Sequence, residues 1–178
     1  MATFETLSSP LIEFIKKQKM FFVATAPKSG RINLSPKGLE SFYILNESTV
    51  YWLNLTGSGN ETEAHLSEDN RMTIMFNSFD ENPLILRLYG MAKSIRMDNE
   101  LWNDLISNFP AHPGARQIIE MKIDLVQTSC GYGVPEMKFV KDRGTLNKWA
   151  TEQGDEKVRD YWDKENRISL DGKRIEGF

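Results

Sequence analysis

The segment that decides the fold reads Leu53-Asn54-Leu55-Thr56-Gly57-Ser58-Gly59-Asn60-Glu61-Thr62-Glu63-Ala64-His65-Leu66. The apolar run before it, residues 50–53, predicts a strand, and the small and hydroxylated residues 56–59 predict a loop. Asn60 is the predicted N-cap of a helix over residues 61–68, and Glu63 completes a capping box. Glycines let backbone N–H groups approach a ligand closely, and a helix start favours negative charge. The loop is therefore either an anion site suited to phosphate or an ordinary capped connection.

A second polar feature lies upstream, where residues 31–38 read Arg-Ile-Asn-Leu-Ser-Pro-Lys-Gly. Alternate side chains of a strand point to opposite faces, so Arg31, Asn33 and Ser35 would share one face and the apolar residues between them the other. Pro36 cannot donate to a strand ladder, and the strand is expected to end or bulge there. Lys37 would then lie at a rim where its ammonium could reach a phosphate. The polar face either lines a ligand site or faces solvent.

The remaining pattern predicts a mainly β protein with peripheral helices. Residues 8–19 and 99–108 predict two short amphipathic helices. Further strands are predicted over residues 20–25, 42–45, 50–55, 71–76, 84–95 and 117–126. Gly90 suits a bulge or a sharp bend in one of them. Many antiparallel strands with few helices indicate a closed or partly closed barrel.

The pattern changes after residue 127, where a glycine-rich turn leads to two helix-like segments over residues 145–152 and 155–166. We therefore expect a barrel domain over residues 1–127 and a C-terminal helical extension over residues 128–178. Large aromatic side chains in the extension need a surface to bury against. That surface is either the barrel or a partner subunit.

Composition and charge restrict the function classes. The 178 residues are 40% hydrophobic and 26% charged, as in ordinary soluble globular proteins. The net charge of -3 argues against a general binder of nucleic acid or of anionic membranes. No apolar run approaches the roughly 18 residues of a spanning helix, and residues 1–7 lack a secretory pattern, so neither secretion nor membrane insertion is expected. With Cys130, His65 and His112 as the only soft ligands, no metal site is expected, and a reducing cytoplasm is the expected location.

Taken together, three parts of the chain resemble the pyridoxamine 5′-phosphate oxidase-like family of FMN-binding split barrels. They are Asn-x-Ser-Pro-Lys-Gly at residues 33–38, the segment 51–65 with Gly-Ser-Gly-Asn-Glu-Thr as its most specific part, and the pair 71–76 and 86–90. The resemblance covers residues 10–97 by element order. It implies a six-stranded antiparallel split β-barrel, and a homodimer with two FMN molecules at the subunit interface.

The resemblance also implies which residues hold the cofactor. The polar strand residues would lie along the flavin ring edge and the ribityl chain, with Lys37 or Arg31 able to reach the phosphate. The loop and the helix start would supply the other contacts. The implied cofactor-binding residues are Arg31, Asn33, Ser35, Lys37, Asn54, Thr56, Gly57, Ser58, Gly59, Asn60 and Thr62.

Two departures separate this chain from the authentic vitamin B6 oxidase. The oxidase carries an Arg-Lys pair for the FMN phosphate at the helix start, whereas this chain has Glu61 and Thr62 in that register. The C-terminal Arg/His motif that binds the pyridoxal phosphate group has no counterpart here. A vitamin B6 oxidase activity is therefore not the first expectation, and phosphate binding is expected to depend on hydroxyls, amides and the strand cations. The run at residues 127–135, with the tail at residues 162–172, resembles an extension found in an uncharacterised branch of the family.

The sequence thus predicts an FMN-dependent oxidoreductase of unassigned substrate, working with a small-molecule substrate or electron donor. A second hypothesis is a non-catalytic carrier of flavin, haem or deazaflavin. A third is a structural dimer with a vestigial site, for which Glu61 in place of a cation is the argument.

Overall fold

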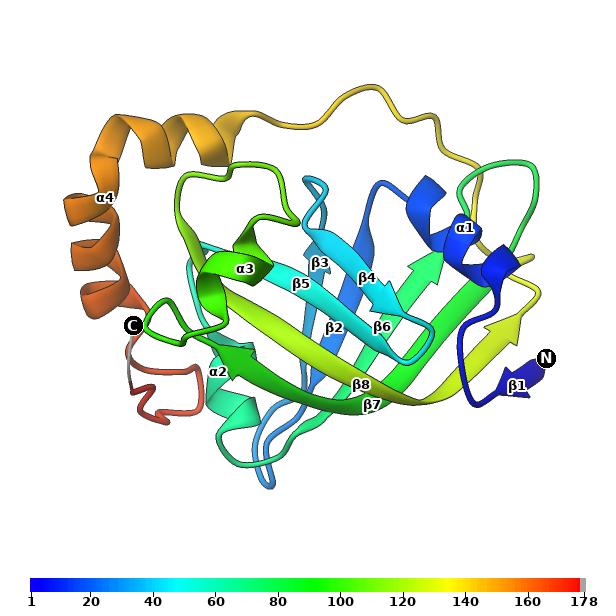
Figure 1. The fold of residues 1–178 in the computed structure, drawn as a ribbon, viewed down its shortest axis with the longest axis horizontal. Helices are drawn as coiled ribbons and strands as arrows, with labels where there is room; N and C mark the ends of the chain where they lie inside the picture. The colour runs from blue at the N-terminus through cyan, green and yellow to red at the C-terminus, as the bar shows by residue number, and fades with distance from the viewer. Residues whose placement is uncertain (177–178) are drawn as a thin grey trace.

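The computed structural model describes residues 1–176, which form one antiparallel sheet curled into a barrel with helices around it (Figure 1). The strands are β1 (Ala2–Phe4), β2 (Phe21–Thr25), β3 (Asn33–Lys37), β4 (Phe42–Asn46), β5 (Thr49–Leu55), β6 (Arg71–Asn77), β7 (Ile85–Ile95) and β8 (Ala115–Ser129). The helices are α1 (Ser9–Lys17), α2 (Glu61–Leu66), α3 (Trp102–Ile106) and α4 (Thr145–Glu165). This architecture confirms the predicted fold class, mainly β with peripheral helices.

The strand order shows where the barrel is split. Neighbouring strands follow the order β3-β2-β6-β7-β8-β5-β4, and β1 pairs with β8. β3 and β4 are therefore the two edges of the sheet, although they follow each other in the chain. The short connection between them contains Leu39 and Glu40 at positive φ, 60° and 54°, where non-glycine residues carry conformational strain. The split lies beside this turn.

Two details of the predicted barrel are wrong. The sheet has eight strands in the described part of the chain rather than six. β1 could not be predicted, because its three residues are all exposed and carry no alternating pattern. The upstream strand does not end at Pro36 but continues to Lys37, since an edge strand tolerates a residue without an N–H group.

The barrel core is filled by apolar side chains from alternate positions of the strands. Val23, Trp52 and Ile74 point into it and are each 0% exposed. β5 is buried on both faces, because Tyr51 and Leu53 pack in a second cluster with residues of α3. Continuous burial of this kind fixes the end of β5, and with it the start of the loop that follows.

β3 turns its polar residues toward the protein and its apolar residues outward. Ile32 and Leu34 are 76% and 63% exposed, whereas Asn33, Ser35 and Lys37 are partly buried. The interpretation of a polar face open to solvent is therefore wrong. The inverted pattern brings three polar side chains next to the loop after β5.

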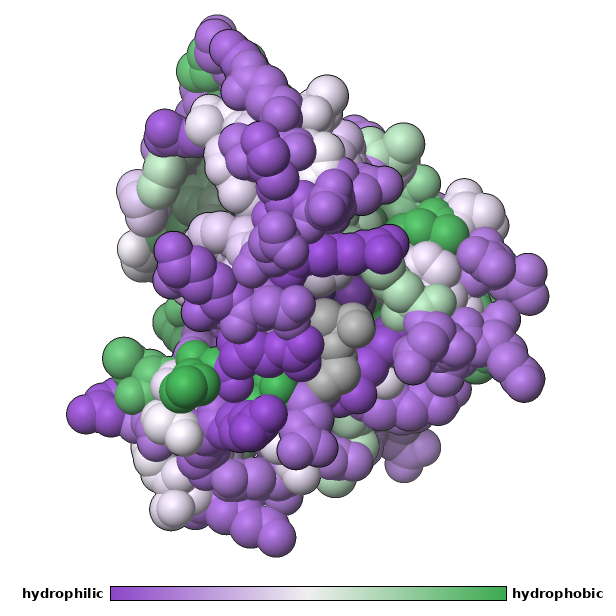
Figure 2. Space-filling model, turned by 90° about the vertical axis from the view of Figure 1, so that its left-hand side faces the viewer, coloured by the Kyte–Doolittle hydropathy of each residue, from purple (hydrophilic) through white to green (hydrophobic). Residues whose placement is uncertain are grey.

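The C-terminal part begins as an irregular segment, residues 130–144, which passes over one end of the barrel and leads to α4 (Figure 1). We call residues 136–144 the crossing segment. A non-helical residue, Gly154 at φ 75°, divides α4 into the two helical parts that the sequence predicts. The boundary predicted at residue 127 falls inside β8. The face that carries α4 and the C-terminal tail is mostly hydrophilic, with one compact apolar cluster low on that face (Figure 2).

Within residues 1–176, no helix has the length and apolar character needed to cross a membrane.

The bulge at Gly90 gives a test of the fold. The pairing of β7 with β8 shifts register between Tyr89 and Gly90, and a Cβ at residue 90 would lie 1.9 Å from the carbonyl oxygen of Lys122. We expect Gly90→Ala to lower the free energy of unfolding by about 2–3 kcal/mol in urea denaturation, because the two strands must separate. Gly133→Ala is the matched control, since no atom lies within 4 Å of its added Cβ, and should change stability by less than about 0.5 kcal/mol. Equal stability of both variants would contradict the close approach.

Candidate anion-binding site

A polar pocket of about 250 Å³ lies where β3, the loop after β5, and the start of α2 meet. Nine of the eleven sequence-predicted residues line it. They are Asn33, Ser35, Lys37, Asn54, Gly57, Ser58, Gly59, Asn60 and Thr62. Glu61 and Arg116 complete the lining. The structure therefore joins the two halves that the sequence predicts separately, the polar strand face and the glycine loop.

Lys37 brings a poorly solvated cation to this pocket. Its Nζ lies over the ring of Trp52, 5.0 Å from the ring centroid. Burial, and second the nearby positive charge of Arg116, lower the pKa of Lys37 to about 8. No carboxylate in residues 1–176 lies within ion-pair distance of it. The Lys37 charge is thus uncompensated by the chain.

Arg116, at the start of β8, brings a second buried cation. Its residue is 3% exposed, and burial lowers its pKa to about 10, while the charge of Glu63 opposes that shift. Nη1 donates to Asn166 Oδ1 at 2.5 Å, and both Nη atoms lie 3.3 Å from the Gly59 carbonyl oxygen. The Glu63 carboxylate instead pairs with Arg96 at 2.8 Å. A buried cation held by neutral oxygens favours the entry of an anion, because burying unpaired charge is costly.

Several donors around the pocket have no acceptor in the described structure. They include Asn33 Nδ2, Asn60 Nδ2 and Arg116 Nε, all buried. The backbone N–H groups of loop residues 57–59 also reach no acceptor within residues 1–176. Buried donors are normally satisfied, so this set indicates a ligand rich in oxygen. Together with two cations, it fits a phosphate group.

Asn54 and Asn60 shape the loop from within. Asn54 Nδ2 donates to Asn60 Oδ1 at 3.1 Å and to Gln117 Oε1 at 3.0 Å. The predicted capping box is wrong, since Asn60 makes no side-chain cap bond and Glu63 is held by Arg96. α2 has only six residues, so its dipole contributes little to anion binding. The positive charge at the pocket comes instead from the side chains of β3 and β8.

The C-terminal part fixes the loop from outside. Asn166, 0% exposed, donates from Nδ2 to the Gly57 carbonyl oxygen at 3.0 Å while accepting from Arg116. Glu61 accepts the backbone N–H of Leu170 at 2.9 Å. Glu61, which stands where the oxidases have a cation, therefore attaches the C-terminal tail to the loop. The loop is held between β5, β8 and residues 162–170.

Two predicted site residues lie elsewhere. Arg31 precedes β3 and pairs with Asp171 of the tail. Thr56 is buried, donates to the Gly114 carbonyl oxygen at 2.7 Å, and accepts from Trp162 Nε1 at 2.8 Å. Neither lines the pocket, because both are used to attach the C-terminal part to the barrel.

Arg116 is the residue that sequence reasoning missed. The predicted strand began at residue 117, two positions after the start of β8 and one after Arg116. A signal was present, since a charged residue directly before an apolar strand needs a partner once the strand is buried. The partner residue, Asn166, lies 50 positions away, and no local pattern could identify it.

Among residues 1–176, no group of three or more His, Cys, Asp or Glu side chains is placed to hold a metal ion.

Comparisons with known proteins agree with this geometry. The family model for pyridoxamine 5′-phosphate oxidase matches residues 10–130. Among curated proteins, the chain is 41% identical over 147 residues to the pyridoxamine 5′-phosphate oxidase family protein ustO of Aspergillus flavus. That match covers 80% of this chain and 59% of the relative, so the chain spans less than two thirds of the relative's length.

Solved structures share the fold at low sequence identity. HupZ of Group A Streptococcus has a TM-score of 0.56 and 14% identity, with 74% of this chain and 99% of that chain covered. The FAD binding protein from Mycobacterium smegmatis has a TM-score of 0.51 and 14% identity, with 70% and 96% covered. These two likenesses concern the fold alone. The family model and the identity to the fungal relative extend to the sequence, and on that basis the chain belongs to the pyridoxamine 5′-phosphate oxidase family.

Proposed function

We propose that this chain is an FMN-dependent oxidoreductase acting on a small molecule, with the flavin held at a homodimer interface. The observation that carries the proposal is the pair Lys37 and Arg116, two cations that line one pocket and have no ion-pair partner among residues 1–176. A phosphate dianion is the group that such a pocket accommodates best.

The pocket would hold the phosphate end of FMN and leave the ring outside. Its volume of about 250 Å³ is below the roughly 300–1,000 Å³ typical of sites for drug-sized ligands. Lys37 and Arg116 would neutralise the phosphate, and the loop N–H groups and Asn60 would donate to its oxygens. Bound FMN would supply reversible hydride transfer at its N5 position. The family supports this choice, and so does the FAD binding protein of the same fold, because that fold accommodates a flavin nucleotide.

A homodimer is supported by the outer face of β3. Ile32 and Leu34 are exposed on an edge strand, directly behind the polar side chains of the pocket. Exposed apolar residues on an edge strand favour association with another chain. A second copy placed there would also cover the flavin ring that the small pocket leaves outside.

The first prediction concerns cofactor affinity. Lys37→Met and Arg116→Met should each raise the dissociation constant of FMN by about tenfold to a hundredfold, because each removes a charge-assisted hydrogen bond. Quenching of FMN fluorescence on titration measures the affinity. Lys164→Met, whose side chain is 82% exposed on α4, is the control and should bind as the parent does.

Full affinity in Lys37→Met, or a parent protein that binds no FMN, would exclude this site assignment. If FMN binds, anaerobic reduction by a nicotinamide donor followed by turnover with an acceptor distinguishes an enzyme from a carrier. Absence of turnover with a panel of acceptors would favour the carrier.

The second prediction concerns pH. Lys37 titrates near pH 8 in the free protein, and a bound dianion would raise its pKa, so affinity is highest when Lys37 is protonated. FMN affinity should therefore fall by up to roughly tenfold between pH 7.5 and 9, a window in which a phosphate with a second pKa of about 6 does not titrate. Arg116 stays charged there, with its pKa of about 10. In Lys37→Met the pH dependence of FMN affinity should disappear. A pH dependence that persists in this variant would arise from another titrating group.

The third prediction concerns the interface. Ile32→Glu with Leu34→Glu should convert a dimer to a monomer in light scattering, because four like charges would meet across the two-fold axis. FMN affinity should fall at the same time. Met91→Glu with Leu101→Glu is the control, since both are apolar positions that are 49% exposed and lie outside β3 and the pocket. A dimer that survives the β3 substitutions would place the interface elsewhere.

A further inference from the structure

A large groove lies between the barrel and the crossing segment. It has a volume of about 1,020 Å³ and is bordered by the end of α1, the end of β3, the loop after β6, the crossing segment and the start of α4. Its apolar lining includes Met20, Leu39, Phe79, Phe139, Leu146 and Trp149. An apolar cavity of this size suits a small organic molecule with an aromatic body.

The crossing segment is fixed in place over this groove. The Met137 N–H donates to the Phe79 carbonyl oxygen at 2.9 Å, and Lys19 Nζ lies 5.6 Å from the centroid of the Phe139 ring. Trp149, at the far end, packs edge-on against Tyr161 with ring centroids 5.2 Å apart. The crossing segment lies beyond residue 130, where the match to the family model ends. The C-terminal part therefore supplies about half of the groove's lining, nine of its 19 residues.

The rim of the groove is strongly cationic in a chain of net charge -3. Its cations are Lys17, Lys19, Lys37, Lys138, Lys141 and Arg143. None of these six lies within ion-pair distance of a carboxylate in the part of the chain that the structure describes. Only two acids, Asp80 and Asp142, share the lining, and Asp80 already accepts from Ser78 Oγ and the Asn82 N–H. Such a surplus of one sign attracts anions.

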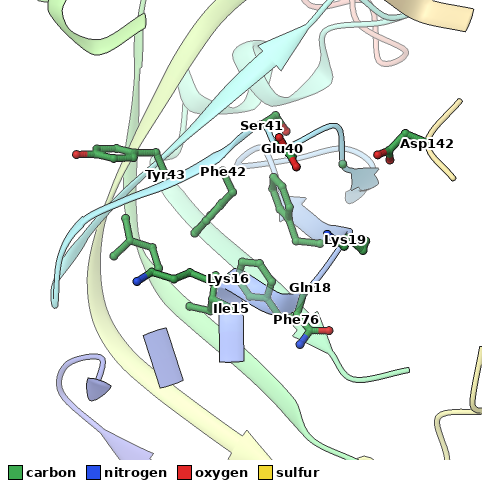
Figure 3. Close-up of a pocket in the computed structure, with 13 residues that line it drawn as sticks. Ile15, Lys16, Gln18, Lys19, Glu40, Ser41, Phe42, Tyr43, Phe76 and Asp142 are labelled. Atoms are coloured by element: carbon green, nitrogen blue, oxygen red, sulfur yellow. The ribbon is translucent and has the colours of Figure 1, made fainter. Parts of the chain in front are cut away.

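The groove adjoins the proposed cofactor site at one shared residue. Lys37 lines both, so a molecule in the groove would lie next to the pocket that holds the phosphate. On its other side the groove shares Lys19 and Asp142 with a smaller hollow of about 320 Å³ beside α1. Figure 3 shows the rings of Phe42 and Phe76 in the middle of this hollow and Asp142 approaching from the crossing segment. The groove therefore has the cofactor pocket as one neighbour and an aromatic hollow as the other.

We propose that this groove binds the substrate of the flavin site, and that the substrate is an apolar aromatic molecule carrying a carboxylate. The apolar lining would cover the ring system, and the lysines of the rim would pair with the carboxylate. Calling the ligand a substrate rests on the proposed function, whereas its chemical class rests on the groove alone.

The test uses three probes of equal shape and different charge on the full chain: 2-naphthoate, 2-naphthamide and 2-naphthylmethylamine. Calorimetric titration should show naphthoate binding about tenfold more tightly than the amide, and the amine binding most weakly. Lys138→Gln with Lys141→Gln should weaken naphthoate about fivefold and leave the amide unchanged. Lys148→Gln with Lys164→Gln removes the same charge outside the groove and should have no effect.

Each titration is run with and without FMN, so that the two proposals can fail separately. Naphthoate that binds with the expected charge pattern while FMN does not bind would overturn the proposed function and leave the ligand class standing. Displacement of naphthoate by FMN would show that the groove belongs to the cofactor and overturn the substrate proposal. Equal binding of the three probes, no binding of any, or no effect of the rim substitutions would also overturn it.

Discussion

Lys37 and Arg116 are two cations brought to one pocket, and within residues 1–176 no carboxylate forms an ion pair with either of them, although Glu61 shares the lining. Burial lowers the pKa of both side chains. Each positive charge also makes the other less favourable, whereas an acidic side chain in the same place would stabilise a cation. The surrounding groups relieve this cost only in part, since Arg116 is held by the oxygens of Asn166 and Gly59 and Glu63 acts on it without forming an ion pair. An arrangement of this kind is stable in the folded chain only because the rest of the barrel positions it.

The barrel does so by reversing the usual orientation of an edge strand. A strand with one buried face normally turns its apolar residues inward, yet β3 turns Asn33, Ser35 and Lys37 inward and leaves Ile32 and Leu34 exposed. Pairing with β2 fixes this register, with Val23 opposite Ser35. A slip of one residue would exchange the two faces, so the register of one five-residue strand decides both the cation of the pocket and the apolar outer surface.

Much of this could be predicted from local pattern. Alternation in residues 31–37 predicted the polar face, and the glycine loop before α2 predicted part of the polar pocket, because each signal is contained in a few neighbouring residues. Arg116 and the positions of Arg31 and Thr56 could not be predicted in this way. They depend on Asn166, Asp171 and Trp162, which come from the other end of the chain. Contacts between distant segments leave no periodic signal in either one.

The replacement of a cation by Glu61 and the presence of the C-terminal part can be understood as a single change. An Arg or Lys at residue 61 would serve a phosphate directly, whereas Glu61 accepts the Leu170 N–H and so attaches the tail. The tail follows Asn166, which orients Arg116, and Arg116 supplies a cation from β8. The positive charge thus comes from Arg116 on β8. Glu61, at the start of α2, holds the C-terminal segment whose Asn166 positions Arg116. If the pocket holds the phosphate as proposed, Glu61 belongs to a rebuilt site rather than a vestigial one, because Arg116 is kept buried with no ion-pair partner in residues 1–176.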